Sequence, residues 1–146
     1  MSNMLIMAEI AGRHCAFRAS EVDTIVEIEN ITPIPRAPKF LVGLTALRSR
    51  ALTVFDCRLI IDKNSTDHKT DSRAVVILSE GHSYALLVDE VRDVGEMLSE
   101  PTQIPGGFGK VWSRIAEGIV ETDNGPALLL AASQLVETKH SSLRAA

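Results

Sequence analysis

The side chains that could hold a metal ion are scattered along the chain. The 146 residues include four histidines and two cysteines: His14, His68, His82, His140, Cys15 and Cys57. No two histidines have the four-residue spacing that places both on one helix face, and no cysteine stands at ligand spacing from another. We therefore expect no metal site, and we expect both cysteines to be buried as small apolar residues.

Residues 105–110, PGGFGK, contain the glycines and lysine of a phosphate-binding loop but not its spacing. Such a loop needs four residues between its glycines and a hydroxyl after the lysine, whereas Val111 follows Lys110. We interpret this segment as a flexible loop that exposes Phe108, an aromatic side chain suited to contact with another protein.

The acidic residues have no catalytic arrangement either. Asp89, Glu90 and Asp93 follow an expected strand, where carboxylates cap and begin a helical turn. Asp56 precedes CRLII and is interpreted as the N-cap of a brief helix. The sequence therefore predicts no catalytic residues and no cofactor, and it favours a binding protein over an enzyme.

A pair of arginines gives the strongest indication of binding, within residues 32–56, TPIPRAPKFLVGLTALRSRALTVFD. Prolines hold the start of this stretch extended, because proline fixes φ and restricts the residue before it. Residues 40–44 and 52–55 are predicted to form a hairpin with Arg48 and Arg50 near its tip. The two arginines could simply solvate the turn, but the surrounding sequence favours a partner contact.

Composition excludes several classes of partner. The net charge is −4, and six aromatic residues are present, which disfavours a nucleic-acid surface that needs basic charge and stacking platforms. The longest apolar runs, 74–78 and 127–132, are too short to span a bilayer. We expect a soluble cytoplasmic protein with no direct membrane insertion.

An internal repeat predicts the fold. In the first part of the repeat, equivalent residues recur 69 positions later: Gly12 matches Gly81 and Glu21 matches Glu90. In the second part the offset is 75 positions: Gly43 matches Gly118 and Val54 matches Leu129. Each half then carries about five short strands and a terminal helical turn. We predict an all-β fold of two small five-stranded barrels packed together.

Polar residues 62–73 are predicted to link the two halves, since they include no large apolar side chain. The chain 1–146 is expected to be a single domain with approximate subdomains 14–61 and 74–136. The N-terminal strand is expected to be shared between them.

The two repeats differ at one equivalent turn. Residues 46–50 carry two arginines, whereas residues 121–125, ETDNG, form an acidic hairpin tip with Asn-Gly turn chemistry. This difference suggests separate partner surfaces, although exposed turns also vary by chance.

Six motifs in this order, SEVDTIVEI, TPIPRAPKFLVGL, ALRS, LTVFD, LLVDEVRDV and LLLAASQLV, resemble the CheW family of bacterial chemotaxis coupling proteins. The resemblance covers residues 5–136. It implies two SH3-like barrels and a non-enzymatic adaptor. Such an adaptor joins a CheA-type histidine kinase to the cytoplasmic tip of methyl-accepting chemoreceptors, and is recruited to membrane-associated receptor arrays.

The resemblance also implies roles for single residues. Val22 and Arg48 match positions associated with receptor contact, and Arg50 lies on the same hairpin. Phe108 falls in the region implied to meet the kinase. The family motif has asparagine and glycine where this chain has Ala46 and Ser49.

Two alternatives to the coupling function follow from the sequence. A divergent CheW-like scaffold of a parallel kinase pathway, such as surface motility or biofilm control, would have the same barrels. A small-molecule sensor would use the groove between the barrels as its pocket.

Overall fold

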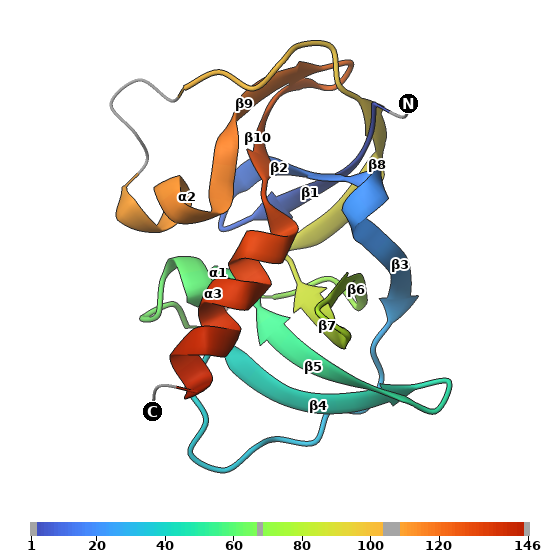
Figure 1. Cartoon of the computed structure of the whole chain (residues 1–146), viewed down its shortest axis with the longest axis vertical. Coiled ribbons are helices and arrows are strands. Elements are labelled where there is room, and N and C mark those ends of the chain that lie inside the picture. Colours follow the sequence, from blue (N-terminus) through green and yellow to red (C-terminus); the bar gives the residue numbers. More distant parts are fainter. Residues whose placement is uncertain (1–2, 67–68, 104–108, 145–146) are drawn as a thin grey trace.

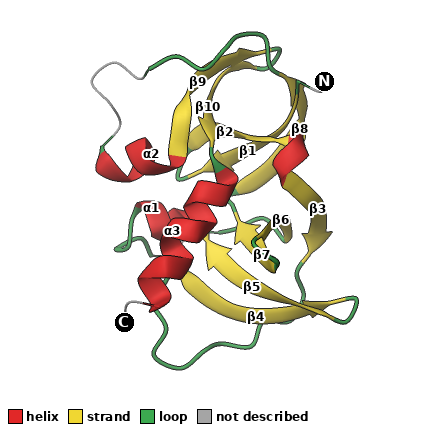
Figure 2. Cartoon of the chain, in the orientation of Figure 1, coloured by secondary structure: helices red, strands yellow, loops and turns green. Residues whose placement is uncertain are grey.

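The computed structural model describes residues 3–66, 69–103 and 109–144, which form two five-stranded sheets and short helices (Figures 1 and 2). The first sheet has the order β8 (Glu90–Glu96), β1 (Met4–Ile10), β2 (Arg13–Arg18), β10 (Gly125–Leu130) and β9 (Ala116–Thr122). The second has the order β3 (Val22–Glu27), β6 (Arg73–Ser79), β7 (His82–Leu87), β5 (Arg50–Asp56) and β4 (Leu41–Leu47). The helices are the 3-10 turn η1 (Ala19–Glu21), α1 (Cys57–Ile61), α2 (Lys110–Ile115) and α3 (Ala132–Arg144).

The two repeats exchange strands. β1 and β2 of the first repeat share a sheet with β8, β9 and β10 of the second, and β6 and β7 share the other sheet with β3, β4 and β5. The registers are equivalent: Leu128 lies opposite Cys15 on parallel strands in one sheet, as Thr53 lies opposite Tyr84 in the other. Neither sheet therefore coincides with the sequence segments 14–61 or 74–136, because each needs strands from both halves.

In each sheet, a pair of backbone hydrogen bonds connects the two edge strands. The backbone of Thr32, after β3, exchanges two hydrogen bonds with Leu44 of β4, and Thr102, after β8, does the same with Ile119 of β9. Gly43 precedes Leu44 in a β-bulge, and its φ of 153° is available mainly to glycine. The ladders remain open, but these isolated bridges limit the exposed edges.

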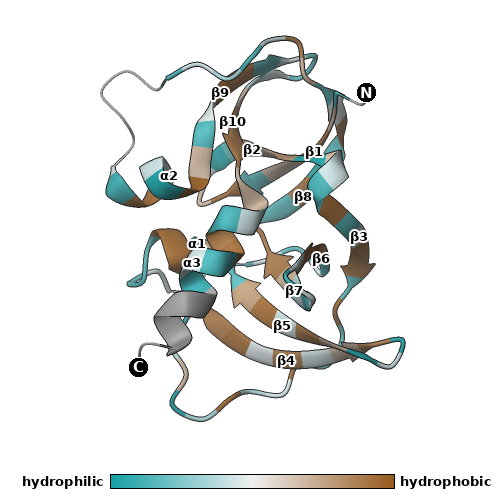
Figure 3. Ribbon diagram, viewed as in Figure 1, coloured by the Kyte–Doolittle hydropathy of each residue, from teal (hydrophilic) through white to brown (hydrophobic). Residues whose placement is uncertain are grey.

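The core has three parts because both faces of the central strands are buried. Along β1, Leu5 and Met7 pack into a cluster formed within the first sheet, whereas Ile6 and Ala8 face a cluster that includes residues of both sheets. A third cluster lies within the second sheet. This two-sided burial explains why central strands such as β6 and β10 contain nearly continuous apolar runs, and Figure 3 shows hydrophobic residues in both sheets.

The short helix α1 follows β5 at the predicted N-cap. The side chain of Asp56 accepts hydrogen bonds from the backbone N–H groups of Arg58, at 2.9 Å, and Leu59, at 3.4 Å. These bonds satisfy donors that have no partner within the helix. The structural role predicted for Asp56 is confirmed.

Candidate partner-binding surface

The predicted arginine hairpin is present, and Arg48 and Ser49 form its tip. Leu47 of β4 pairs with Arg50 of β5, which leaves a two-residue loop with φ values of 50° at Arg48 and 70° at Ser49. Positive φ at both positions is typical of a type I′ turn, whose twist matches that of the strands. The turn therefore adopts a conformation favoured by glycine although neither residue is glycine.

Two other hairpins of the chain show what this turn lacks. The β1–β2 loop consists of Ala11 and Gly12, and the β6–β7 loop of Glu80 and Gly81, all with positive φ. Each has glycine at the second position, where Ser49 stands in the arginine hairpin. A left-handed conformation costs a residue with a Cβ about 1–2 kcal/mol. The tip at Arg48 and Ser49 is thus a site of backbone strain, and such strain is concentrated at functional sites.

Arg50 is tied to the start of β3. One guanidinium nitrogen lies 3.0 Å from a carboxylate oxygen of Asp23. Asp23 directly follows Val22, which opens β3 and packs, half-buried, against the core cluster between the sheets. The structure therefore joins Arg50 to β3 beside Val22.

Arg48 has a different environment from Arg50. Its side chain is exposed at the tip, and it forms no hydrogen bond or ion pair with the residues that the structure describes. The tip lies at the lower right in Figure 1, away from α1 and α3, and is hydrophilic in Figure 3. Arg48 is thus exposed to solvent at the tip, whereas Arg50, two residues later, is held by Asp23.

A groove with exposed apolar side chains, which no pattern in the sequence indicates, borders the hairpin. It has a volume of about 640 Å³ and lies between residues 27–32 and the β4–β5 hairpin, where Ile28, Leu44 and Leu47 line it together with Glu27 and Glu29. Leu44 is 42% exposed. We call the tip residues Arg48, Ser49 and Arg50 together with this groove the hairpin surface. Basic side chains at a hairpin tip, next to a groove with exposed apolar side chains, are suited to a protein partner.

The equivalent acidic hairpin uses its side chains within the fold. Asp123 accepts a hydrogen bond from the N–H of Glu96 at 2.9 Å, and Thr122 accepts one from the N–H of Asn124 at 3.0 Å. The two tips therefore differ in more than charge: the acidic one is bonded inward and the basic one presents Arg48.

Among the described residues, the other side chains singled out from the sequence do not line the groove of the hairpin surface. Phe108 lies outside the described residues. Cys15 and Cys57 are buried in the cluster between the sheets, as predicted, and burial raises the pKa of the Cys15 thiol to about 12. Within the described ranges, no group of histidine, cysteine and carboxylate side chains is arranged to hold a metal ion, and no helix there is long and apolar enough to span a membrane.

Comparisons with known proteins agree with this architecture. A crystal structure of the scaffolding protein TtCheW from Thermoanaerobacter tengcongensis matches with a TM-score of 0.73 and 24% identity, over 89% of this chain and 84% of that one. This likeness confirms the predicted all-β fold of two SH3-like units, here as sheets whose ladders do not fully close.

The sequence has relatives of the same kind. The chemotaxis protein CheW of Thermotoga maritima is 26% identical over 132 residues, which cover 88% of this chain and 84% of that protein. The family model of the CheW-like domain matches residues 4–140, nearly the whole chain. The chain therefore belongs to the family of CheW-like domains.

Proposed function

We propose that this chemotaxis scaffold is a non-enzymatic adaptor that couples methyl-accepting chemoreceptors to a CheA-type histidine kinase. Family membership over residues 4–140 supports an adaptor role. The exposure of Arg48 on a strained turn anchored by the Asp23–Arg50 ion pair is the observation that carries the receptor contact.

The hairpin surface is the proposed receptor-binding site. Arg48 would meet an acidic group on the receptor tip, and the groove beside Leu44 would receive apolar side chains. Val22 and Arg50 are proposed to contribute to the same contact, since Asp23 ties Arg50 to β3 beside Val22. Because Arg48 is exposed, its replacement should change binding without unfolding the protein.

The test is assembly of a ternary complex from the purified protein, its CheA-type kinase and a receptor cytoplasmic fragment. Arg48→Glu should weaken receptor binding by about tenfold or more, since it turns an attraction into a repulsion. Arg36→Glu is the matched control, because Arg36 is also exposed and also has positive φ, 64°. Equal binding by Arg48→Glu and the control would refute this contact, and no complex with any such kinase would refute the adaptor role.

The kinase contact is proposed separately at Phe108, from the family resemblance. Phe108→Ala should weaken kinase binding and leave receptor binding unchanged, whereas Arg48→Glu should do the reverse. Measuring both affinities for both variants distinguishes two surfaces from one. Loss of both contacts in either variant would contradict the assignment.

The pathway is a second question, raised by Ala46 and Ser49, which replace the asparagine and glycine of the family turn. A divergent scaffold of a parallel kinase pathway would bind the kinase and receptor of that pathway in preference to the chemotaxis pair. Competition between the two kinases for the purified protein decides this. A fluorescent fusion that gathers in receptor arrays would support the chemotaxis assignment and the proposed cytoplasmic location.

A further inference from the structure

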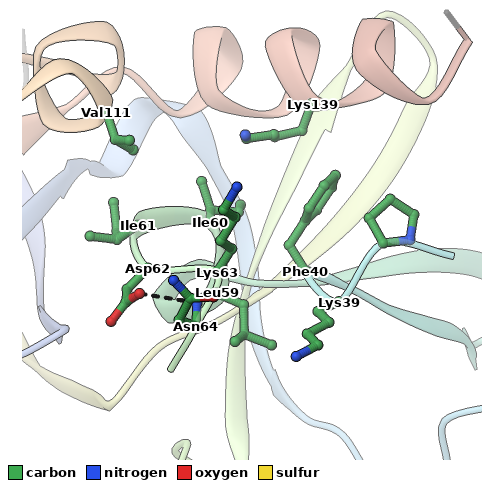
Figure 4. A pocket seen from close by; sticks show the side chains of 11 residues that line it. Lys39, Phe40, Leu59, Ile60, Ile61, Asp62, Lys63, Asn64, Val111 and Lys139 are labelled. Atoms are coloured by element: carbon green, nitrogen blue, oxygen red, sulfur yellow. Dashed lines mark hydrogen bonds between the residues drawn. The ribbon is translucent and has the colours of Figure 1, made fainter. Parts of the chain in front are cut away.

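A second groove lies on the helical side of the molecule (Figure 4). It has a volume of about 750 Å³ and lies between residues 38–40, α1 with the residues that follow it, and α3. Leu59, Ile61 and Val111 line it with half-buried apolar side chains. None of its lining residues belongs to the hairpin surface. It is a concave surface separate from the hairpin surface that is proposed to bind the receptor.

The groove lies where the two repeats differ. Helix α2 directly precedes β9, packs against α1 and α3, and buries Trp112 and Ile115. The equivalent segment before β4, residues 35–40, contains two prolines and forms no helix. Arg36 within it has a φ of 64°, which is not helical. A helix therefore covers this position in the second repeat, whereas in the first repeat the non-helical residues 38–40 line the groove.

The rim of the groove is basic. Lys39, Lys63 and Lys139 line it together with a single acidic residue, Asp62. None of the three lysines forms an ion pair with a residue that the structure describes, and the ammonium group of Lys139 lies 5.2 Å from the ring centre of Phe40. The chain as a whole carries a net charge of −4. This local excess of positive charge complements an acidic ligand with an apolar side.

We propose that this groove binds a short, acidic, amphipathic helix of a partner protein, in the position that no helix of the first repeat fills. Apolar side chains spaced three or four residues apart would contact Leu59, Ile61 and Val111. Acidic side chains on the flanks would face Lys39, Lys63 and Lys139. This inference goes beyond the proposed coupling function and does not rest on it.

The probe for this site is derived from α2. It is a peptide of residues 109–116, held helical by a staple on its solvent side, with the changes Lys110→Glu and Arg114→Glu. A second stapled peptide keeps the native lysine and arginine. The acidic peptide should bind the full-length protein at least about tenfold more tightly than the basic one, by fluorescence anisotropy. Its binding should shift the backbone NMR signals of Phe40, Ile61 and Lys139.

Charge reversal in the groove tests the location. The double variant Lys39→Glu, Lys63→Glu should bind the acidic peptide about tenfold more weakly than the native protein. Lys69→Glu is the matched control, because Lys69 is exposed in the linker but does not line the groove. Circular dichroism and thermal unfolding establish that each variant is folded. Unchanged affinity in a folded double variant, no binding of the acidic peptide, or NMR shifts confined to the hairpin surface would overturn the proposal.

Two other occupants are distinguished in the same series. Sedimentation velocity on the protein alone should show no dimer that depends on Lys39 and Lys63. A dimer abolished by the double variant would assign the groove to a second copy of the chain and overturn the proposal. Dodecanoate, which has a carboxylate and an apolar chain but no helix, should displace the peptide weakly. Tighter binding of dodecanoate than of the peptide would assign the groove to a small amphiphile instead.

Discussion

The guanidinium group of Arg50 lies 3.0 Å from the carboxylate of Asp23, and this contact joins the tip of the β4–β5 hairpin to the first residues of β3. The two side chains are 44% and 36% exposed. An ion pair this exposed contributes little to stability, because water and salt screen it. Its position predicts another role, which is to hold Arg50 and the adjoining turn, where Arg48 is exposed, beside β3.

Asp23→Ala should therefore separate stability from binding. We expect the free energy of unfolding to change by less than about 1 kcal/mol, and receptor binding to weaken because the turn loses its restraint. Glu9→Ala is the matched control, since Glu9 forms a similarly exposed pair with Arg92 at 2.9 Å on the other sheet. Urea unfolding and receptor titration of both variants are the measurements. Receptor binding that falls equally in both variants would contradict the positioning role.

Local strand pairing was predictable from the sequence, but sheet membership was not. The constant offsets and the apolar runs identify the hairpins β1–β2 and β6–β7, whose strands are adjacent in the chain. They do not decide whether β3 joins β1 or β6, because both strands present similar apolar residues to it. The observed pairing of Ile25 with Val75, and of Ile6 with Val94, is long-range and repeats by the internal symmetry.

The candidate site was predictable to the same extent. Alternation and turn chemistry placed Arg48 and Arg50 near the hairpin tip, whereas the partner of Arg50 lies 27 residues earlier in the chain. Exposed ion pairs leave no periodic signal in a sequence. Helix α2 was missed because the preceding glycines suggested a loop up to Lys110. The three-residue spacing of the buried residues Trp112 and Ile115 was a signal that could have revealed it.

The bridge that brings β3 and β4 together depends on Gly43. A Cβ at this position would overlap the carbonyl oxygen of Thr32, and the φ of 153° would strain the backbone as well. Gly43→Ala should therefore lower the free energy of unfolding by more than about 3 kcal/mol. At Gly12 the φ is also positive, 78°, but a Cβ would meet nothing within 4 Å. Gly12→Ala should cost about 1–2 kcal/mol, and equal losses by urea unfolding would contradict the steric argument.

Asp71 should make stability depend on pH. Its carboxylate accepts hydrogen bonds from the N–H groups of Val91, at 2.7 Å, and Arg73, at 3.0 Å. Burial opposes ionisation, but these bonds and the Arg73 guanidinium outweigh it and lower the pKa of Asp71. Asp71→Asn should cost about 1–3 kcal/mol at neutral pH, because it loses charge-assisted bonds.

The sign of the pH effect follows from the lowered pKa. The stabilisation by Asp71 is complete above the pKa of the unfolded chain and is lost as the pH falls through the lower pKa of the folded protein. The difference between the native protein and Asp71→Asn, measured by urea unfolding, should therefore shrink in acid. Asp93→Asn, on an exposed position of β8, is the control and should change stability little. A difference for Asp71→Asn that stays constant down to acid pH would contradict the assignment.

The last prediction concerns the strain stored beside Arg48. Ser49 has a φ of 70° at a turn position that holds glycine in two other hairpins of this chain, at Gly12 and Gly81. Ser49→Gly should raise the free energy of unfolding by about 1 kcal/mol, because glycine adopts this conformation without a steric penalty. Ser49→Ala keeps the penalty and should leave stability nearly unchanged. Glycine also allows the turn more backbone conformations. Ser49→Gly should therefore increase the mobility of the tip in NMR relaxation and weaken receptor binding despite its greater stability. A variant that gains stability and binds the receptor as tightly as before would show that the turn needs no strain to present Arg48.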